Sequence, residues 1–243
     1  MDKAQRQIYT SVTMPKRRSA IQKYYGESGD YLHDHQSFFK SANVNDDIHF
    51  LIKVLNLKKE DHILDIACGQ GRHANTLANK GYLIDGVDFS SHLLNLAKRE
   101  AQQLKGRMPD YYLAEVTKLR LKKKYNKAYW FFSDLASIDI PKAMTAISRN
   151  MTKGGKVLID SDNIFRIISC LQKHRKSNLL FDAERLELID KKTNVYAPYP
   201  VIPLWRQWMK DTNLSIERIF GGYKCQDYSI HSPRLILLAR KTA

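Results

Sequence analysis

The sequence predicts an α/β fold, a doubly wound sheet that is mostly parallel and has helices on both faces. From residue 62 onward, short apolar runs typical of buried strands alternate with amphipathic helical segments, an order that builds parallel βαβ units. A glycine-rich turn joins the first of these strands to its helix. The last two apolar runs are separated by a short segment without a helix, so they form a hairpin and the final strand is antiparallel.

Composition is consistent with a single domain. The chain has 243 residues, 43% hydrophobic and 27% charged, as in ordinary globular proteins. No apolar run reaches the ~18 residues of a membrane span, and the basic N-terminus lacks the apolar region of a secretory signal. The three cysteines are scattered, which predicts neither a disulfide framework nor a zinc site. We expect a cytoplasmic protein without a metal.

The net charge of +15 favours negatively charged binding partners but does not identify one class of them. A positive field attracts nucleic acid, acidic lipid, or a small phosphate or carboxylate. The basic residues are spread along the chain and form no single stripe interleaved with aromatic residues. A small, anionic substrate therefore stays open beside the simpler interpretation of a generally basic surface.

Residues 1–43 are expected to form a basic tail followed by a helical lid, with helices near 21–25 and 31–40. The main domain then begins with a helix over 44–57, whose apolar residues repeat on one face. Asn45, Asp46 and Asp47 place acceptors and negative charge where a helix N-terminus favours them, so we predict that this helix starts there.

The remaining elements follow in order. Gly81 is suited to end the helix 71–80, Ser90 or Ser91 can cap the helix 91–104, and a glycine pair at 154–155 leads from the helix 138–151 into the fifth strand. Residues 163–213 break the alternation and are predicted to form a cap insertion within a main domain of 44–243. The expected strands are 62–67, 82–88, 110–116, 127–133, 156–160, 214–222 and 233–241.

The turn after the first strand reads ILDIACGQGRH, residues 63–73, with Gly69 and Gly71 on either side of one glutamine. A strand–glycine turn–helix unit points backbone N–H groups and the positive end of the helix at a ligand. The glycines alone are unspecific. Asp88, at the end of the second strand, adds a carboxylate that can accept both hydroxyls of a ribose. Together they predict a nucleoside-binding site.

Asp65 distinguishes between two such ligands. It precedes the first glycine by four residues and would lie among the loop amides, where a pyrophosphate would be repelled. A zwitterion that carries an ammonium and a sulfonium would not be. Asp65 therefore favours an adenosyl sulfonium ligand over a dinucleotide, and disfavours an NAD(P)-dependent oxidoreductase.

At this point the sequence resembles the class I S-adenosylmethionine-dependent methyltransferases of the small-molecule type. LDIACGQGRHANTLANKGYLIDGVDFSSHLLNLAK is similar to their first motif, the following helix and the ribose-binding acid. AEV, TKGGKVLID and GGYKCQDYSIHSPRLILLARK extend the likeness over about 44–241, with 163–213 matching least. The resemblance implies a Rossmann-like seven-stranded sheet with an antiparallel last strand. It also implies S-adenosyl-L-methionine as cofactor and S-adenosyl-L-homocysteine as product.

The resemblance also implies roles for individual residues. The methionine part of the cofactor would lie among Asp65, Cys68, Gly69 and Gly71, and Asp88 would bind the ribose. The adenine would lie against Phe89, Glu115 and Val116, with Phe132 as a further cofactor contact. Two positions depart from the family pattern: Glu115 stands where aspartate is commoner, and Asn126 stands where the fourth strand usually opens with Phe-Asp.

Substrate residues are expected at the carboxyl ends of the strands and in the segments that cover them. His231, in the loop 221–232, is a candidate general base, with a hydrogen-bonded loop histidine as the alternative. Trp205 is available to the cap, although it is equally suited to pack a helix onto the sheet. The candidate substrate contacts are Tyr25, Asp134, Asn163, Tyr196, Tyr223 and Tyr228.

The function predicted is methyl transfer to an O or N atom of a small metabolite or natural product. An RNA methyltransferase is the first alternative, given the net charge. Against it, the loop after the fourth strand reads FSDLAS and lacks the Pro-Pro-aromatic motif of enzymes that methylate base amines, while Cys170 lies too far along the chain to match a pyrimidine-methylating nucleophile. A catalytically silent partner subunit with the same fold is the second alternative.

Overall fold

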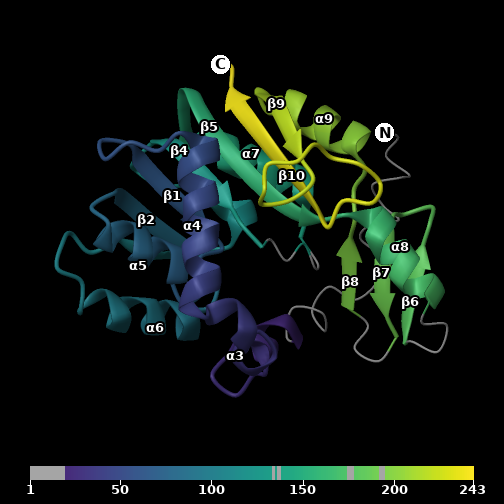
Figure 1. Cartoon of the computed structure of the whole chain (residues 1–243), viewed down its shortest axis with the longest axis horizontal. Helices are drawn as coiled ribbons and strands as arrows, with labels where there is room; N and C mark the ends of the chain where they lie inside the picture. The colour runs from purple at the N-terminus through teal and green to yellow at the C-terminus, as the bar shows by residue number, and fades with distance from the viewer. Residues whose placement is uncertain (1–19, 133–134, 136–137, 174–177, 192–194) are drawn as a thin grey trace.

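A seven-stranded sheet forms the centre of the protein (Figure 1). The computed structural model describes residues 20–132, 135, 138–173, 178–191 and 195–243. The strand order is β3-β2-β1-β4-β5-β10-β9, and β10 is antiparallel to both of its neighbours, which confirms the predicted fold class. The strands are β1 (His62–Ile66), β2 (Leu83–Asp88), β3 (Tyr111–Leu113), β4 (Tyr125–Trp130), β5 (Met151–Asp162), β9 (Leu214–Phe220) and β10 (Arg234–Lys241).

Helices cover both faces of this sheet because alternate residues of each strand point to opposite sides. Ile63 of β1 belongs to the apolar cluster under α4, α5 and α6, whereas Leu64 belongs to the cluster under α7 and α9. Each face is therefore closed by its own apolar layer. The helices are α4 (Ser41–Leu55), α5 (Arg72–Asn79), α6 (Ser91–Ala101), α7 (Ile140–Asn150) and α9 (Ile202–Lys210).

The predicted start of the first main-domain helix was wrong. α4 begins at Ser41, and Lys40 precedes it without a side-chain cap. Asp47 consequently lies inside the helix, where it is buried and its Oδ2 lies 3.1 Å from Nε2 of His73 on α5. The carboxylate thus serves a contact between two helices rather than a helix terminus, a use that local patterning does not reveal.

Strand boundaries shift where partners across the sheet determine them. β3 ends at Leu113 and is followed by the short 3-10 helix η2 (Val116–Lys118), whereas a strand through residue 116 was expected. β4 runs from Tyr125 to Trp130, earlier than the predicted 127–133. β5 extends beyond the predicted 156–160 at both ends, because Met151 pairs with Tyr125 of β4 and Asp162 pairs with Arg234 of β10.

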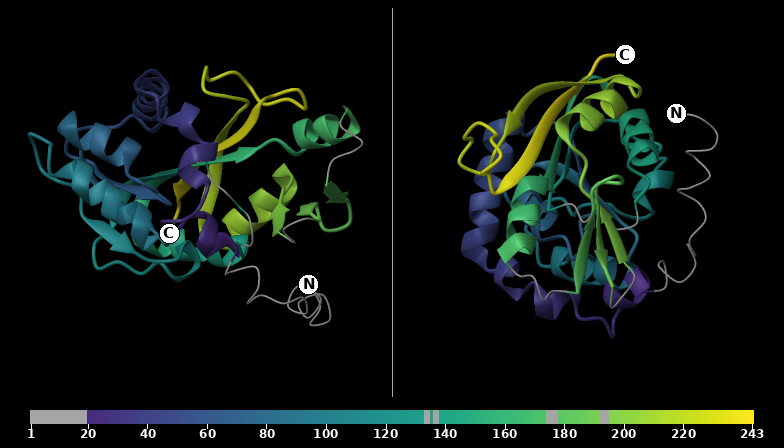
Figure 2. Two further views of the ribbon diagram at one scale, coloured as in Figure 1. Left: turned by 90° about the horizontal axis from the view of Figure 1, so that it is seen from below. Right: turned by 90° about the vertical axis from the view of Figure 1, so that its right-hand side faces the viewer.

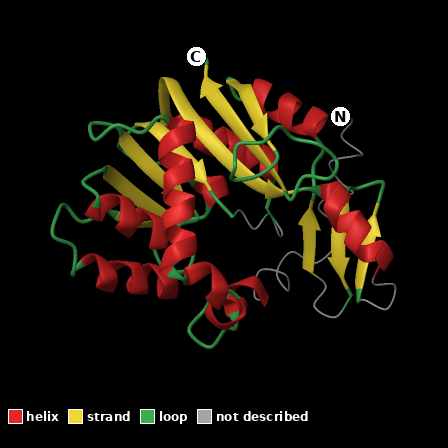
Figure 3. Cartoon of the chain, in the orientation of Figure 1, coloured by secondary structure: helices red, strands yellow, loops and turns green. Residues whose placement is uncertain are grey.

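The insertion after β5 consists of α8 (Ile164–Lys173) and a separate antiparallel sheet of β6 (Leu179–Asp182), β7 (Glu187–Asp190) and β8 (Val195–Pro198). Figure 2 (left) and Figure 3 show this small sheet apart from the central one. α9 also falls within the predicted cap, but it packs on the central sheet, and Trp205 is fully buried in the core there. None of the described helices is long and apolar enough to cross a bilayer.

The N-terminal segment contributes a helical turn at 20–24, α3 (Tyr31–Asp34) and the 3-10 helix η1 (Gln36–Phe39). Its aromatic side chains form a cluster in which the Tyr25 ring lies 4.6 Å from Tyr31 and 5.4 Å from Phe89. Ser90 connects this segment to the sheet. Its Oγ donates to the Tyr25 carbonyl at 2.7 Å and accepts from the Leu93 N–H at 3.2 Å as the N-cap of α6.

We expect Ser90→Ala to lower the free energy of unfolding by about 1 kcal/mol, since it removes an N-cap as well as the contact to Tyr25. Urea denaturation measures this loss. Ser91→Ala is the matched control because Ser91 is the exposed next residue, and it should change stability by only a few tenths of a kcal/mol. Equal losses in both variants would contradict the assigned role.

Candidate functional site

A cavity of about 1160 Å³ lies over the carboxyl ends of the parallel strands. Its walls come from the loops after β1, β2, β3 and β4, from the ends of β5 and β10, from the N-terminal segment, and from β8 with the residues that follow it. This is the edge of a doubly wound sheet where ligands bind. Of the predicted site residues, those that line it are Tyr25, Gly69, Asp88, Phe89, Glu115, Val116 and Phe132.

The glycine loop has the backbone that its sequence requires. Ala67, Gly69 and Gly71 all have positive φ, at 55°, 56° and 78°. Gly69 lines the cavity, but Gly71 does not. A Cβ on Gly71 would lie 2.5 Å from the Tyr111 hydroxyl and 2.8 Å from the Ala97 Cβ. The second glycine therefore permits close packing against β3 and α6, rather than close approach to a ligand.

Asp88 fixes this loop from the end of β2. Its Oδ2 accepts the Gly69 N–H at 2.9 Å, and its Oδ1 accepts the Ser90 N–H at 2.8 Å. Burial raises the pKa of the carboxyl group, while these backbone N–H groups oppose the rise. Since each carboxylate oxygen has more than one acceptor site, Asp88 retains capacity for ligand hydroxyls in the cavity it lines.

Asp65 and Cys68 are buried and do not belong to the cavity lining. Oδ2 of Asp65 makes no hydrogen bond within the described part of the chain. Burial raises the pKa of Asp65 to about 8, although the nearby Tyr129 hydroxyl and the positive charge of Arg72 oppose the rise. A buried carboxyl oxygen without a partner beside the glycine loop is a group that a bound cation would satisfy.

Asp65 should make the ligand-free protein less stable as pH rises. Its pKa is higher in the folded state than the ordinary value of 3.8, so the folded protein binds the extra proton between about pH 4 and pH 8. The free energy of unfolding should therefore fall across that interval. The free energy of unfolding of the Asp65→Asn variant should fall less over the same pH range. Urea denaturation at several pH values measures both proteins. Parallel pH curves for both proteins would contradict the assignment.

Glu115, Val116 and Phe132 line the cavity next to the loop. Glu115 forms an ion pair with Lys118 at 3.2 Å, at the start of η2. Phe132 has a φ of 51°, a left-handed conformation that is uncommon for a bulky residue. Its N–H donates to Oδ2 of Asp160 at 2.9 Å, a contact that supports this conformation.

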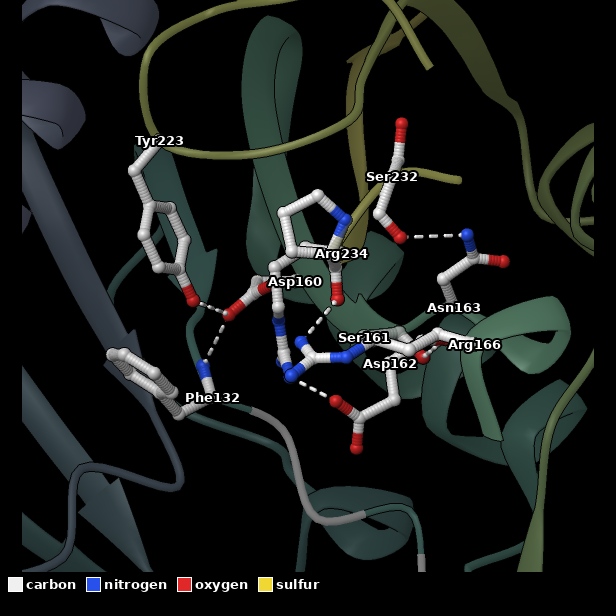
Figure 4. Close-up of polar contacts among 10 residues, drawn as sticks. Phe132, Asp160, Ser161, Asp162, Asn163, Arg166, Tyr223, Ser232 and Arg234 are labelled. Atoms are coloured by element: carbon white, nitrogen blue, oxygen red, sulfur yellow. Dashed lines mark hydrogen bonds and ion pairs between the residues drawn. The ribbon is translucent and has the colours of Figure 1, made fainter. Parts of the chain in front are cut away.

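Asp160 organises the opposite half of the cavity (Figure 4). It is fully buried at the end of β5 and accepts hydrogen bonds from the Phe132 N–H, the Tyr223 hydroxyl and Nε of Arg234, each at 2.9 Å. Burial raises its pKa, and the positive charge of Arg234 opposes that rise. One carboxylate thus connects the loops after β4 and β9 to the first residue of β10.

The sequence of residues 63–155 matches the profile of the methyltransferase domain family. That match covers less than half of the chain, from β1 into β5. Among curated proteins, the ubiquinone biosynthesis O-methyltransferase of Coxiella burnetii is 42% identical over 45 residues, which are 18% of this chain. That alignment spans only about a fifth (19%) of the relative's length.

Solved structures match the methyltransferase domain together with its flanking elements. An S-adenosylmethionine-dependent methyltransferase from Clostridium acetobutylicum has a TM-score of 0.69 at 16% identity, covering 88% of this chain and 99% of that one. The CcbJ methyltransferase of Streptomyces caelestis has a TM-score of 0.70 at 14% identity, and the match covers 91% of this chain and 99% of that one. A magnesium protoporphyrin IX methyltransferase from Synechocystis, solved with bound S-adenosylhomocysteine, has a TM-score of 0.63 at 15% identity. The match covers 93% of this chain and 100% of that one. The chain has the fold of these enzymes.

Several predicted substrate residues of this domain do not line the cavity. Asn163 is fully buried, where its Nδ2 donates to the Ser232 carbonyl at 2.8 Å and its Oδ1 accepts the Tyr228 hydroxyl at 2.8 Å. Both residues thus hold the loop 221–232 against the end of β5. The Tyr223 hydroxyl donates to Asp160 (Figure 4), and its ring lies 5.6 Å from that of Phe132. Tyr196 lies on β8 outside the lining, although Tyr199 belongs to it.

The candidate base is also placed elsewhere. His231 is exposed in its loop, and its N–H donates to Oγ of Ser229 at 3.3 Å. It does not line the cavity, and a role of its ring as general base stays a prediction. Asp134 lies outside the described residues. Sequence reasoning missed Arg72 and Arg234, which both line the cavity; the position of Arg72 directly after the glycine loop was the available signal.

Proposed function

We propose that the protein is an S-adenosylmethionine-dependent methyltransferase that acts on an O or N atom of a small metabolite or natural product. The observation that carries this proposal is the cavity itself. It joins the glycine loop and Asp88 on one side to an arginine- and phenylalanine-lined half on the other. Its volume of about 1160 Å³ slightly exceeds the ~300–1,000 Å³ of typical ligand pockets, as expected for two ligands side by side.

The residues present fit the cofactor. Asp88 is positioned to accept the ribose hydroxyls, and Phe89 with Val116 offers apolar surface for the adenine. Glu115 would accept a hydrogen bond from the adenine amine. From behind the cavity lining, the unpartnered oxygen of Asp65 would favour the positive charge of the methionine part. When bound, the cofactor supplies a methyl group on a sulfonium, an already activated leaving group.

The protein's contribution is alignment in a site shielded from water. Holding acceptor and methyl in line is worth ~7–11 kcal/mol of the barrier. The N-terminal aromatic cluster, fixed to α6 through Ser90, covers the cofactor side of the cavity. Bound there, the cofactor would give its methyl group to the acceptor and leave as a neutral thioether, and the proton of the acceptor would pass to solvent.

Transfer of labelled methyl from S-adenosylmethionine into a cytoplasmic extract tests the proposal. We expect the label to appear in small molecules. Label in RNA would instead support the alternative that the net charge of +15 suggests, and binding to RNA should then weaken steeply with salt because phosphate contacts release counterions. Absence of transfer despite cofactor binding would support the silent-subunit alternative.

A further inference from the structure

Two guanidinium groups lie close to one phenyl ring in the cavity. The central carbon of the Arg72 guanidinium lies 4.9 Å from the Phe132 ring centroid, and that of Arg234 lies 5.7 Å from it. Arg72 also lies 5.4 Å from the ring of Phe39. All but Phe39 belong to the cavity lining. Both guanidinium groups thus lie within 6 Å of the centre of the same ring, and arginine is the side chain best suited to bind a carboxylate or phosphate.

The place of this pair in the sheet separates it from the nucleoside half. Asp88 ends β2 and Glu115 follows β3, at one edge of the sheet. Phe132 follows β4, and Arg234 opens β10 opposite Asp162 of β5, on the other side of β1. Arg72, the first residue of α5, has its guanidinium near Phe132 and thus near this second half. The anion site therefore faces the space left for the acceptor.

Two carboxylates fix the guanidinium group of Arg234 in place. Its Nε donates to Oδ1 of Asp160 at 2.9 Å, and its Nη1 donates to Oδ1 of Asp162. Nη2 has no hydrogen-bond partner within the described part of the chain and is not sealed from solvent. Nε and Nη1 of the guanidinium are thus bound to carboxylates (Figure 4). Nη2 remains available to a ligand in the cavity that Arg234 lines.

Arg72 supplies positive charge that the protein does not balance by a direct ion pair. Lys118 and Lys142 also line the cavity, but they pair with Glu115 at 3.2 Å and Asp139 at 2.8 Å. Among the described residues, no carboxylate makes an ion pair with Arg72. A partly buried guanidinium without an acidic partner favours an anionic ligand.

We propose that the methyl acceptor is a small planar acid, whose carboxylate binds between Arg72 and Nη2 of Arg234. Its ring would pack against Phe132 and Tyr199, which also line the cavity. The proposal rests on the proposed function and specifies its substrate class. The two arginines thereby select a charged acceptor over an uncharged analogue of the same shape.

The test uses the full chain saturated with S-adenosylhomocysteine and a panel of hydroxybenzoates, each paired with its uncharged hydroxybenzamide. Calorimetry should show members of the acid series binding roughly 10-fold tighter than their amides, as expected for charge-assisted hydrogen bonds. Arg72→Gln should remove most of this preference. Arg234→Lys should weaken it while keeping a positive charge for Asp160 and Asp162. Neither variant should change affinity for S-adenosylhomocysteine by more than about twofold.

Arg240→Lys is the matched control. Arg240 lies at the other end of β10 and also pairs with a carboxylate, that of Glu217, but it does not line the cavity. This variant should keep the full preference for acids. If the wild type binds S-adenosylhomocysteine but shows no preference for acids, this inference fails and the proposed function stands. If Arg72→Gln instead lowers the affinity for S-adenosylhomocysteine, Arg72 binds the cofactor rather than the acceptor, and the inference is wrong. No binding of S-adenosylhomocysteine would refute the proposed function itself.

Discussion

Asp88→Asn should lower affinity for S-adenosylhomocysteine by about 100-fold, since hydrogen bonds to a charged group are worth ~1.5–3 kcal/mol each. The carboxylate accepts the N–H groups of Gly69 and Ser90 and faces the cavity. An amide has one acceptor oxygen, so its NH₂ group would point at one of these N–H donors. The loop would lose its fixed position, and the ribose would lose its ionised acceptor. Calorimetry well below the unfolding temperature measures the effect.

Asp85→Asn is the control for that experiment. Asp85 is also a buried carboxylate on β2, but it accepts from the Tyr125 hydroxyl at 2.9 Å and from Lys123 at 3.1 Å, and it does not line the cavity. The Asp85→Asn variant should be less stable than the wild type and bind S-adenosylhomocysteine with unchanged affinity. Equal affinity losses in the two variants would show that the effect of Asp88 is one of general destabilisation.

Gly71→Ala should lower the free energy of unfolding by about 3 kcal/mol. Part of the loss, ~1–2 kcal/mol, comes from placing a Cβ on a residue with positive φ, since Gly71 has φ 78°. The rest comes from the clash of that Cβ with the Tyr111 hydroxyl and the Ala97 Cβ, because overpacking costs ~1–3 kcal/mol. Denaturant unfolding measures the sum.

Gly154 offers a control with the same backbone angle. Its φ is also 78°, but a Cβ there would have no atom within 4 Å. Gly154→Ala should therefore cost only the backbone part, about 1–2 kcal/mol. If both variants lose the same stability, the close packing of the second loop glycine on Tyr111 and Ala97 makes no energetic contribution, and its role would need another explanation.

The sheet and the nucleoside half of the site could be predicted because their signals are local. Gly69 and Asp88 occupy fixed places at the ends of consecutive strands, and the periodicity of the apolar residues shows where those strands end. The hairpin of β9 and β10 followed from the absence of a helix between two apolar runs. In each case, the signal lies within a single βα or hairpin unit.

The acceptor half could not be predicted in the same way, because its contacts join distant segments. Asp160 interacts with Arg234 only because β10 pairs antiparallel with β5 in one particular register. The topology placed Asn163 and Tyr228 at the correct edge of the sheet, but it does not determine side-chain direction. Both turned out to hold the loop together rather than to face the cavity.

We propose that the glycine loop and Asp88 bind an adenosyl sulfonium cofactor. Calorimetry of the purified protein with S-adenosylmethionine, S-adenosylhomocysteine and NADH tests it most directly. We expect binding of the first two at one site and no binding of NADH, because the unpartnered buried oxygen of Asp65 beside the loop favours a positively charged ligand and gives a pyrophosphate no counter-charge. Binding of NADH without binding of either adenosyl compound would contradict it.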